Sequence, residues 1–336
     1  MSRRYWSVIT PMPAALIAAL AKQAEDRGVE GLFAPQVYGP PFIPLAAAAV
    51  TTERIKLASG IAIAPVRSPF ETAMSAIDLD HLSGGRCVLG LGTSVHAWTS
   101  GVFGTPKYKP VSHLRETVAA VRHIIAGAHK GLAPFEGEYY RADFRELQPI
   151  SAPVRERIPI WIAALRSKMV GLAAEVGDGL IGHPMWSVKW TLEKMKPEFE
   201  SELARFGRTR DGIEVNLWPW VAPNENEREA IEDSRPTMAF YGGVKQYEPF
   251  FEWHGFGDVA RKLQEGVGRG DYRTVAHLVP DEMVRTFVAV GKPDKVREQI
   301  EPLWKFADSL CLVPPVYSLP FEKVAGYQEA VAQTFY

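Results

Sequence analysis

The stretch that decides the fold runs from residue 55 to residue 92. It reads IKLASGIAIA (55–64), then a helical segment (69–82) with Pro69 near its start, then GGRCVLGLG (84–92). The first and last runs are almost wholly apolar, as expected for strands that are buried on both faces. Proline inside the start of a helix and glycine after its end are the usual boundary residues. The stretch therefore predicts a strand, a helix and a second, parallel strand.

The same alternation continues along the chain. Strands are expected at 5–10, 31–34, 55–64, 86–92, 158–164, 179–182, 213–221 and 309–313. Helices are expected at 14–27, 42–52, 69–82, 113–126, 168–176, 187–206 and 321–334. Eight such units predict an α/β fold of the closed (β/α)8 TIM-barrel type, and an open doubly wound sheet is the alternative.

Three long segments interrupt this pattern. Segments 95–112 and 127–157 are rich in glycine, proline and aromatic residues, and such loops carry function in barrels. Segment 224–291 looks helical and is interpreted as the largest insertion, between strands seven and eight. We expect one domain over residues 1–336.

Composition narrows the class of protein. The chain has 336 residues, 46% apolar and 23% charged, with a formal net charge of -1, which is typical of a soluble globular protein. The charge balance argues against a nucleic-acid partner bound by bulk charge. The longest charge-free run, 31–52, contains four prolines and predicts no membrane helix. Two cysteines are too few for a disulfide framework, so a cytoplasmic protein is expected.

Most catalytic motifs are missing from the sequence. It has no HExxH, no CxxC, no EF-hand loop and no pair of histidines four residues apart, so no metal site is expected. It also has no Walker A sequence, no GxSxG elbow and no complete GxGxxG fingerprint.

Three segments at the ends of predicted strands could bind a ligand. Segment 58–65 has a glycine inside an apolar strand, which permits a bulge or a close backbone approach. Segment 82–94 places glycines before Thr93 and Ser94. Segment 159–169 ends a strand where a helix begins, with two basic residues, which predicts an anion cradle. Ordinary strand packing or a surface loop would explain each segment equally well.

Together these segments resemble the bacterial-luciferase-like family of flavin- and deazaflavin-dependent oxidoreductases. The most specific stretch is LDHLSGGRCVLGLG (79–92). Three further segments also resemble the family and occur in the family's order along the chain: 24–31, 51–57 and 290–296. The resemblance implies a TIM barrel that binds FMN or coenzyme F-420, an 8-hydroxy-5-deazaflavin. It covers nearly the whole chain.

The resemblance also implies which residues hold the cofactor. In the family, the loop that matches 59–61 often carries a non-proline cis peptide behind the ring, the residues at 93–94 lie near the ring, and the turn at 165–168 binds the phosphate. The residues after the sixth strand could also touch the ligand. The implied cofactor-binding residues are Ser59, Gly60, Ile61, Ala64, Thr93, Ser94, Leu165, Arg166, Ser167, Lys168, Gly182 and His183.

The sequence departs from the family pattern at two places. Several deazaflavin-dependent members carry an Asp-His pair after strand two, and this chain has Gln36 and Val37 at those positions. An acidic residue is common after strand four of the family, and this chain has Val95 there. These changes argue against a sugar-phosphate dehydrogenase with a His and Glu pair. The catalytic candidates that remain are Gln36, Tyr38 and His96, with Tyr139 as a further polar neighbour. Each of the tyrosines and His96 could equally anchor a loop.

Three functions follow from this reasoning. The leading one is hydride transfer between coenzyme F-420 and a small organic substrate, which the loops would select. The second is an FMN-dependent monooxygenase that uses reduced flavin and oxygen. The third is a non-catalytic flavin- or deazaflavin-binding protein; a metal-dependent barrel hydrolase is weaker still. By resemblance we also expect a homodimer.

Overall fold

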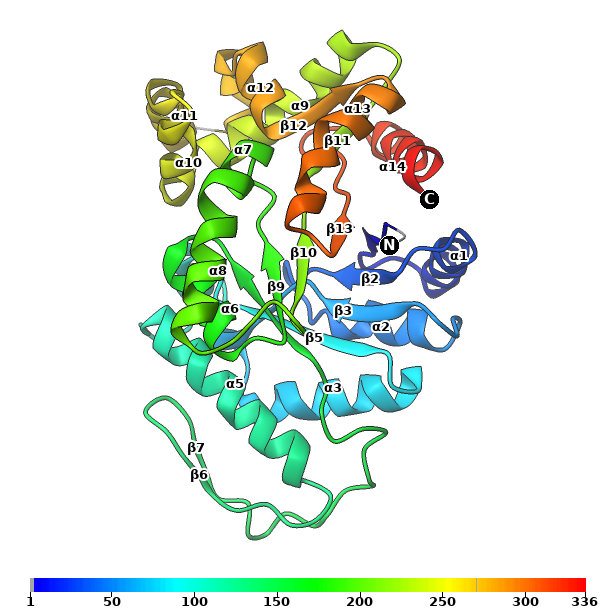
Figure 1. Ribbon diagram of the computed structural model, residues 1–336, viewed down its shortest axis with the longest axis vertical. Coiled ribbons are helices and arrows are strands. Elements are labelled where there is room, and N and C mark those ends of the chain that lie inside the picture. The colour runs from blue at the N-terminus through cyan, green and yellow to red at the C-terminus, as the bar shows by residue number, and fades with distance from the viewer. Residues whose placement is uncertain (1–2, 270) are drawn as a thin grey trace. The chain divides into compact units, whose positions relative to one another are not determined.

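The computed structural model describes residues 3–269 and 271–336 (Figure 1). Eight parallel strands form a closed barrel, which confirms the predicted TIM-barrel fold. The strand order is β3-β2-β1-β13-β10-β9-β8-β5-β4, and β3 also pairs with β5, so the third strand closes the ring in two pieces. The barrel strands are β1 (Tyr5–Val8), β2 (Gly31–Ala34), β3 (Lys56–Ser59), β4 (Ala62–Ile63), β5 (Cys87–Gly92), β8 (Ile160–Ala164), β9 (Gly179–Gly182), β10 (Glu214–Leu217) and β13 (Ser309–Cys311).

The chain divides into two compact units. The first unit comprises Trp6–Ile181 and Glu198–Val215. The second unit comprises residues 3–5, Gly182–Pro197 and Asn216–Tyr336. That residues 1–336 act as one domain stays a prediction.

Helices of the first unit pack side by side in chain order, α1 on α2, α2 on α3, α3 on α5 and α5 on α6 (Figure 1). They are α1 (Ala14–Asp26), α2 (Phe42–Ala49), α3 (Pro69–Ser83), α4 (His96–Gly101), α5 (Pro110–Gly127) and α6 (Ser167–Val176), with a short hairpin of β6 (Phe135–Glu136) and β7 (Arg141–Ala142). Ser68 caps α3 by accepting from the Glu71 N–H, and Gly84 ends it with φ +65°. The boundary residues quoted from the sequence therefore act as predicted.

Aromatic rings fill the core of the first unit. The ring of Trp6 lies 4.5 Å from that of Phe33 and 5.2 Å from that of Trp161, between centroids. A Cβ atom on Gly31 would overlap the Trp6 indole, and one on Gly179 would lie 2.5 Å from the Trp161 indole. Glycine on these strands therefore makes room for the large rings.

Glu25 of α1 fixes the approach to the third strand. Its side chain is 2% exposed, and one carboxylate oxygen accepts from the backbone N–H groups of Glu53, Arg54 and Ile55 at 2.6–3.1 Å. Burial alone would raise the pKa of Glu25, but the three N–H donors outweigh it and lower the pKa to about 2. The carboxylate is therefore a charged part of the fold.

The second unit holds the predicted insertion. Figure 1 shows α9, α12 and α13 gathered around a pair of parallel strands, β11 and β12. The elements are α7 (Val188–Trp190), α9 (Glu227–Gly242), α10 (Glu248–Trp253), α11 (Gly257–Arg269), α12 (Asp281–Phe287), α13 (Pro293–Ile300), α14 (Phe321–Phe335), β11 (Trp220–Pro223) and β12 (Val288–Gly291). Segment 224–291 is thus mostly helical, but it ends in a strand.

Two predicted elements are wrong in detail. The strand expected at 213–221 breaks after Leu217, because Pro219 has no N–H to donate, and β11 then pairs with β12 outside the barrel sheet. The helix expected at 187–206 contains a π turn at Thr191–Met195 and continues as α8 (Lys196–Arg205). Pro197 removes one of the helical N–H donors there.

Candidate functional site

The third barrel strand carries an irregular turn between β3 and β4. The peptide bond between Gly60 and Ile61 is cis, which confirms the geometry expected there. Residues of β3 pair with residues of β5 that lie 30 positions later in the sequence, as Ala58 does with Val88. Residues of β4 pair with residues of β5 that lie only 29 positions later, as Ala62 does with Leu91. The third strand therefore contains one more residue than β5 across this turn, which makes it a bulge.

Neighbouring strands hold the turn in place. The Ser59 hydroxyl donates to the Gly90 carbonyl at 2.8 Å, and the Gly60 N–H donates to the Ala34 carbonyl at 2.8 Å. The Gln36 N–H donates to the Ile61 carbonyl at 3.2 Å. Strands two, three and four of the barrel thus all contribute to this one turn.

Glycine is required where these strands approach each other. A Cβ on Gly90 would overlap the Ser59 carbonyl oxygen, and one on Gly92 would overlap the Ile61 side chain. A Cβ on Gly60 would lie 2.6 Å from the Phe33 ring. Gly90 of β5 therefore lets main chain approach main chain, and Gly92 makes room for the Ile61 side chain.

The Gln36 side chain is a structural partner of the turn. It is 8% exposed, and its Oε1 accepts from the Ile63 N–H at 2.8 Å and from the Arg67 guanidinium at 2.9 Å. Arg67 also pairs with Glu71 at 2.9 Å, and burial lowers the pKa of Arg67. The structure thus gives this catalytic candidate a role in positioning the turn.

Thr93 and Ser94 follow β5, and Ser94 has φ +55°. The Thr93 carbonyl accepts from the Tyr108 hydroxyl at 3.0 Å. Rings then follow one another from His96 to Tyr108 (4.8 Å), to His113 (5.1 Å) and to Tyr139 (5.2 Å), and we name these four residues the aromatic row. Sequence reasoning missed Tyr108 and His113, although the first lies in the aromatic-rich segment 95–112.

Tyr38 is a loop residue with a 72% exposed side chain. Its ring lies 5.7 Å from that of Trp98 on α4, and the Trp98 indole N–H donates to the Val37 carbonyl at 3.2 Å. These contacts join the loop after β2 to α4. They support the anchoring interpretation of Tyr38, and its catalytic role stays a prediction.

Helix α6 begins directly after β8. Arg166, Ser167 and Lys168 are exposed at its start, and the Arg166 carbonyl accepts from the N–H groups of Met169 and Val170. A helix N-terminus carries partial positive charge, and two cations add to it here. Leu165 precedes this turn. Phosphate binding at 165–168 stays a prediction.

Three other predicted residues lie outside these groups. Ala64 is buried at the start of a 3-10 turn, Ala64–Val66. Gly182 and His183 belong to the second unit. His183 accepts from the Met185 N–H through Nδ1 at 3.1 Å, and burial lowers its pKa to about 3. Cofactor binding by these three residues stays a prediction.

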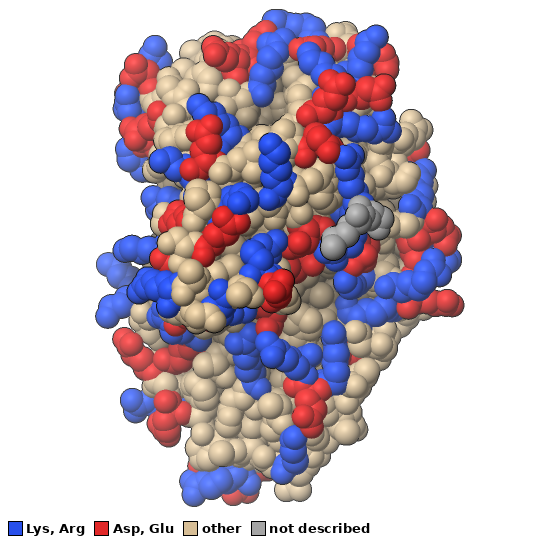
Figure 2. Space-filling view, viewed as in Figure 1, with Lys and Arg blue, Asp and Glu red and all other residues tan. Residues whose placement is uncertain are grey.

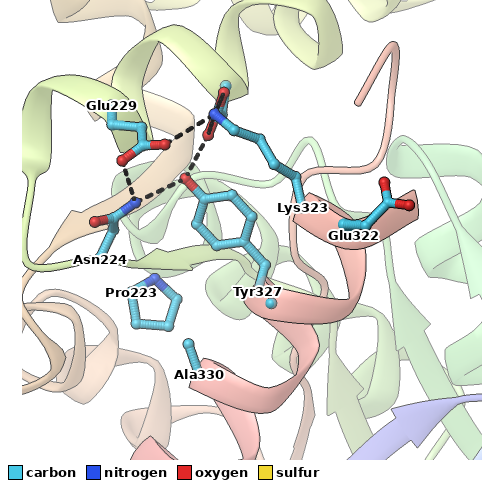
Figure 3. Close-up of a pocket in the computed structure, with 9 residues that line it drawn as sticks. Pro223, Asn224, Glu229, Glu322, Lys323, Tyr327 and Ala330 are labelled. Atoms are coloured by element: carbon cyan, nitrogen blue, oxygen red, sulfur yellow. Dashed lines mark hydrogen bonds and ion pairs between the residues drawn. The ribbon is translucent and has the colours of Figure 1, made fainter. Parts of the chain in front are cut away.

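A cavity of about 450 Å³ lies in the second unit where α14 meets α9 (Figure 3). Lys323 pairs with Asp233 at 2.7 Å and with Glu229 at 2.9 Å, and the Tyr327 hydroxyl donates to Asp233 at 2.9 Å. The amide of Asn224 donates to Glu229 at 3.4 Å. These groups satisfy one another, so the network fastens α14 to α9.

Charges of both signs are interspersed over the face seen in Figure 2. Within residues 3–269 and 271–336, no three His, Cys, Asp or Glu side chains converge as metal ligands would. In the same part of the chain, no helix is long and apolar enough to cross a membrane.

The chain is similar to known proteins over most of its length. The family model for luciferase-like monooxygenases matches residues 4–306. An uncharacterized protein of Mycobacterium tuberculosis is 34% identical over 293 residues, 85% of this chain and 86% of that protein. A second protein of that organism, provisionally named a coenzyme F-420-dependent oxidoreductase, is 32% identical over 327 residues, 92% of each chain.

A solved structure has the same fold along its whole length. The coenzyme F-420-dependent tetrahydromethanopterin reductase from Methanopyrus kandleri superposes with a TM-score of 0.81 at 26% identity, over 99% of this chain and 98% of that one. The resemblance found in the sequence is thereby confirmed. The chain belongs to the luciferase-like monooxygenase family.

Proposed function

We propose that this luciferase-like oxidoreductase transfers hydride between coenzyme F-420 and a small organic substrate. The observation that carries the proposal is the irregular turn at 59–61, a bulge in the third barrel strand against whose main chain a flat ring could lie. Relatives named for coenzyme F-420 point to the same ligand, one at 32% and one at 26% identity.

The residues at the turn fit a deazaflavin. Gly60 and Gly92 let the turn pack closely against the Phe33 ring and the Ile61 side chain, and Ser59 is tied to β5 through its hydroxyl. The start of α6, with Arg166 and Lys168, would hold the phosphate of the ligand's side chain. When bound, a reduced deazaflavin supplies the hydride, while the protein positions the reactants and excludes water.

Proton handling would fall to the aromatic row. His96 begins α4 with its ring against Tyr108, whose pKa is raised by burial. His96 remains the candidate to hold or deliver a proton at an imidazole nitrogen. Changing His96 to alanine should lower turnover without weakening the binding of the cofactor, and unchanged turnover would remove it from this role.

A second function has one observation in its favour. The matching family model is named for monooxygenases, and FMN shares the tricyclic ring and the phosphate of coenzyme F-420. The same turn and the same helix start would then hold reduced FMN. We favour coenzyme F-420 because of the named relatives.

A binding titration tests the proposal. The purified protein is titrated with F-420 and with FMN, and quenching of its tryptophan fluorescence is followed. We expect F-420 to bind at least tenfold more tightly. Tighter binding of FMN would overturn the choice of cofactor, and F-420 binding without hydride transfer to any of a broad panel of substrates would favour a non-catalytic binding protein.

A pair of double variants tests the phosphate site. Arg166→Ala with Lys168→Ala removes two cations at the α6 start and should weaken F-420 about tenfold, since each exposed charge contributes roughly 0.5–1 kcal/mol. Lys107→Ala with Arg141→Ala removes two exposed cations elsewhere in the first unit and should leave affinity unchanged. Equal effects of the two pairs would refute a specific phosphate site.

We also propose a cytoplasmic homodimer, an expectation that comes from the composition and the family resemblance. Sedimentation of the purified protein tests the dimer directly, and a monomer at micromolar concentration would contradict it.

A further inference from the structure

The backbone turns in an unusual way directly after β5. Thr93 and Ser94 follow the strand, and Ser94 has φ +55°. This left-handed conformation is costly for a residue with a side chain, because its Cβ crowds a neighbouring carbonyl oxygen. A residue other than glycine keeps such a conformation only where the surrounding structure imposes it.

The side chains of this turn do not impose it. Within residues 3–269 and 271–336, the hydroxyls of Thr93 and Ser94 form no hydrogen bond with another residue. The main chain, in contrast, has a partner, since the Thr93 carbonyl accepts from the Tyr108 hydroxyl at 3.0 Å. This carbonyl and the Ser94 N–H belong to one planar peptide unit, whose rotation is the φ angle of Ser94. A hydrogen bond at the carbonyl therefore holds the unusual angle.

Tyr108 is itself held by its neighbours. Its ring contacts the imidazole rings of His96 and His113, at centroid distances of 4.8 and 5.1 Å. The hydroxyl of the buried Thr99 lies 3.3 Å from the Tyr108 hydroxyl. Because Tyr108 gives its one proton to the Thr93 carbonyl, Thr99 is the donor in this second bond. Burial raises the pKa of Tyr108, so the phenol keeps its proton at physiological pH.

The backbone around Tyr108 is restricted as well. Segment 105–110 reads TPKYKP, and Pro106 and Pro110 limit the conformations of the residues that precede them. Pro110 is the first residue of α5, which packs against α3 and α6. The phenol therefore reaches the end of β5 from a segment that is fastened to the helices around the first unit.

We propose that Tyr108 is a positioning residue for the cofactor: its hydroxyl holds the peptide unit between Thr93 and Ser94 in the orientation that receives the ring of coenzyme F-420. This inference rests on the proposed function and adds a residue to it. Tyr108 acts through the main chain of the turn. The two unpartnered hydroxyls of the turn are thereby kept in one arrangement before the ligand arrives, which lowers the cost of binding.

A double-mutant cycle between Tyr108→Phe and Ser94→Gly tests the inference. Tyr108→Phe keeps the ring against both histidines and removes only the hydroxyl. Part of the population should then leave the left-handed form, so F-420 affinity, measured by tryptophan fluorescence, should fall about threefold to tenfold. Glycine adopts the left-handed form readily, so beside Ser94→Gly the same change should cost no more than about twofold. Equal losses in the two backgrounds would overturn the inference, because a general loosening of the loop does not depend on residue 94.

Tyr327→Phe is the matched control for this cycle. It also removes a hydrogen-bonded phenol hydroxyl, but from the network between α14 and α9. F-420 affinity should be unchanged in this variant, and a loss equal to that in Tyr108→Phe would contradict a specific effect.

Thr99→Val gives a second reading if Tyr108→Phe fails to fold. It removes the hydroxyl that donates to Tyr108 and keeps the size of the side chain. It should weaken F-420 about twofold to threefold, and this loss should disappear beside Ser94→Gly. A loss that persists there would overturn the inference.

A measurement without ligand separates this inference from the proposed function. Carbon chemical shifts of Ser94 in the ligand-free protein report its backbone conformation, and they should move in Tyr108→Phe but not in Tyr327→Phe. Unmoved shifts in Tyr108→Phe would overturn the role of Tyr108, even if F-420 binds the wild-type protein normally. If the shifts move as expected but F-420 does not bind the wild-type protein, the proposed function fails while the link between Tyr108 and Ser94 stands.

Discussion

Replacing Gln36 with methionine should destabilise the protein and weaken F-420 binding together. Methionine has a similar length but no amide, so the Ile63 N–H and one Arg67 N–H lose their shared acceptor. A buried unpaired N–H costs about 1–3 kcal/mol, and a hydrogen bond from a charged donor contributes about 1.5–3 kcal/mol. Because Arg67 keeps Glu71 as a partner, we expect a loss of about 2–4 kcal/mol in the free energy of unfolding.

Urea unfolding with an unchanged m value measures this loss, and the F-420 titration measures the effect on the turn. Gln36→Glu is the matched control, because it keeps the acceptor oxygen and adds an ion pair with Arg67. A loss below about 0.5 kcal/mol in Gln36→Met would refute the positioning role. Normal stability and F-420 affinity with lost turnover would instead make Gln36 catalytic.

Three further predictions concern the framework around the site. Glu25→Gln should remove a pH dependence of the free energy of unfolding. The pKa of Glu25 is about 2 in the folded protein, below its ordinary value of 4.5. Glu25 therefore contributes about 3 kcal/mol to wild-type stability above pH 4.5, and this contribution is lost as the pH falls toward 2. Urea unfolding at pH 3 and 7 checks this. Gly90→Ala should cost about 3 kcal/mol or more and abolish F-420 binding, because its Cβ would overlap the Ser59 carbonyl; a normal fluorescence titration would contradict it. Tyr327→Phe should cost about 1–2 kcal/mol in thermal unfolding through the lost bond to Asp233, with unchanged F-420 affinity.

Most barrel strands could be predicted because burial on both faces gives them an apolar composition. Helix α3 was bounded correctly by Pro69 and Gly84, whose backbone preferences are local. The break at Pro219 was missed, because residues 213–221 still read as one strand, in which Ile213, Val215 and Leu217 alternate with polar residues. Local composition does not show which strand a residue pairs with.

The candidate site also has parts that could be predicted from the sequence and parts that could not. The turn at Gly60 was identified through a family pattern, and its cis geometry is present. The partners of Gln36 could not be predicted, since Ile63 and Arg67 lie 27 and 31 positions away and meet it only through the sheet. Tyr108 was missed for the same reason, because its contact with the Thr93 carbonyl crosses a loop.

The bulge in the third strand sets a limit on how this barrel can change. Since the register on β5 shifts by one position across residues 59–61, a deletion there would return β3 and β4 to one regular strand. The scaffold would gain a continuous ladder and lose the irregular turn. A single surplus residue thus separates a plain barrel from one whose third strand is interrupted by an irregular turn.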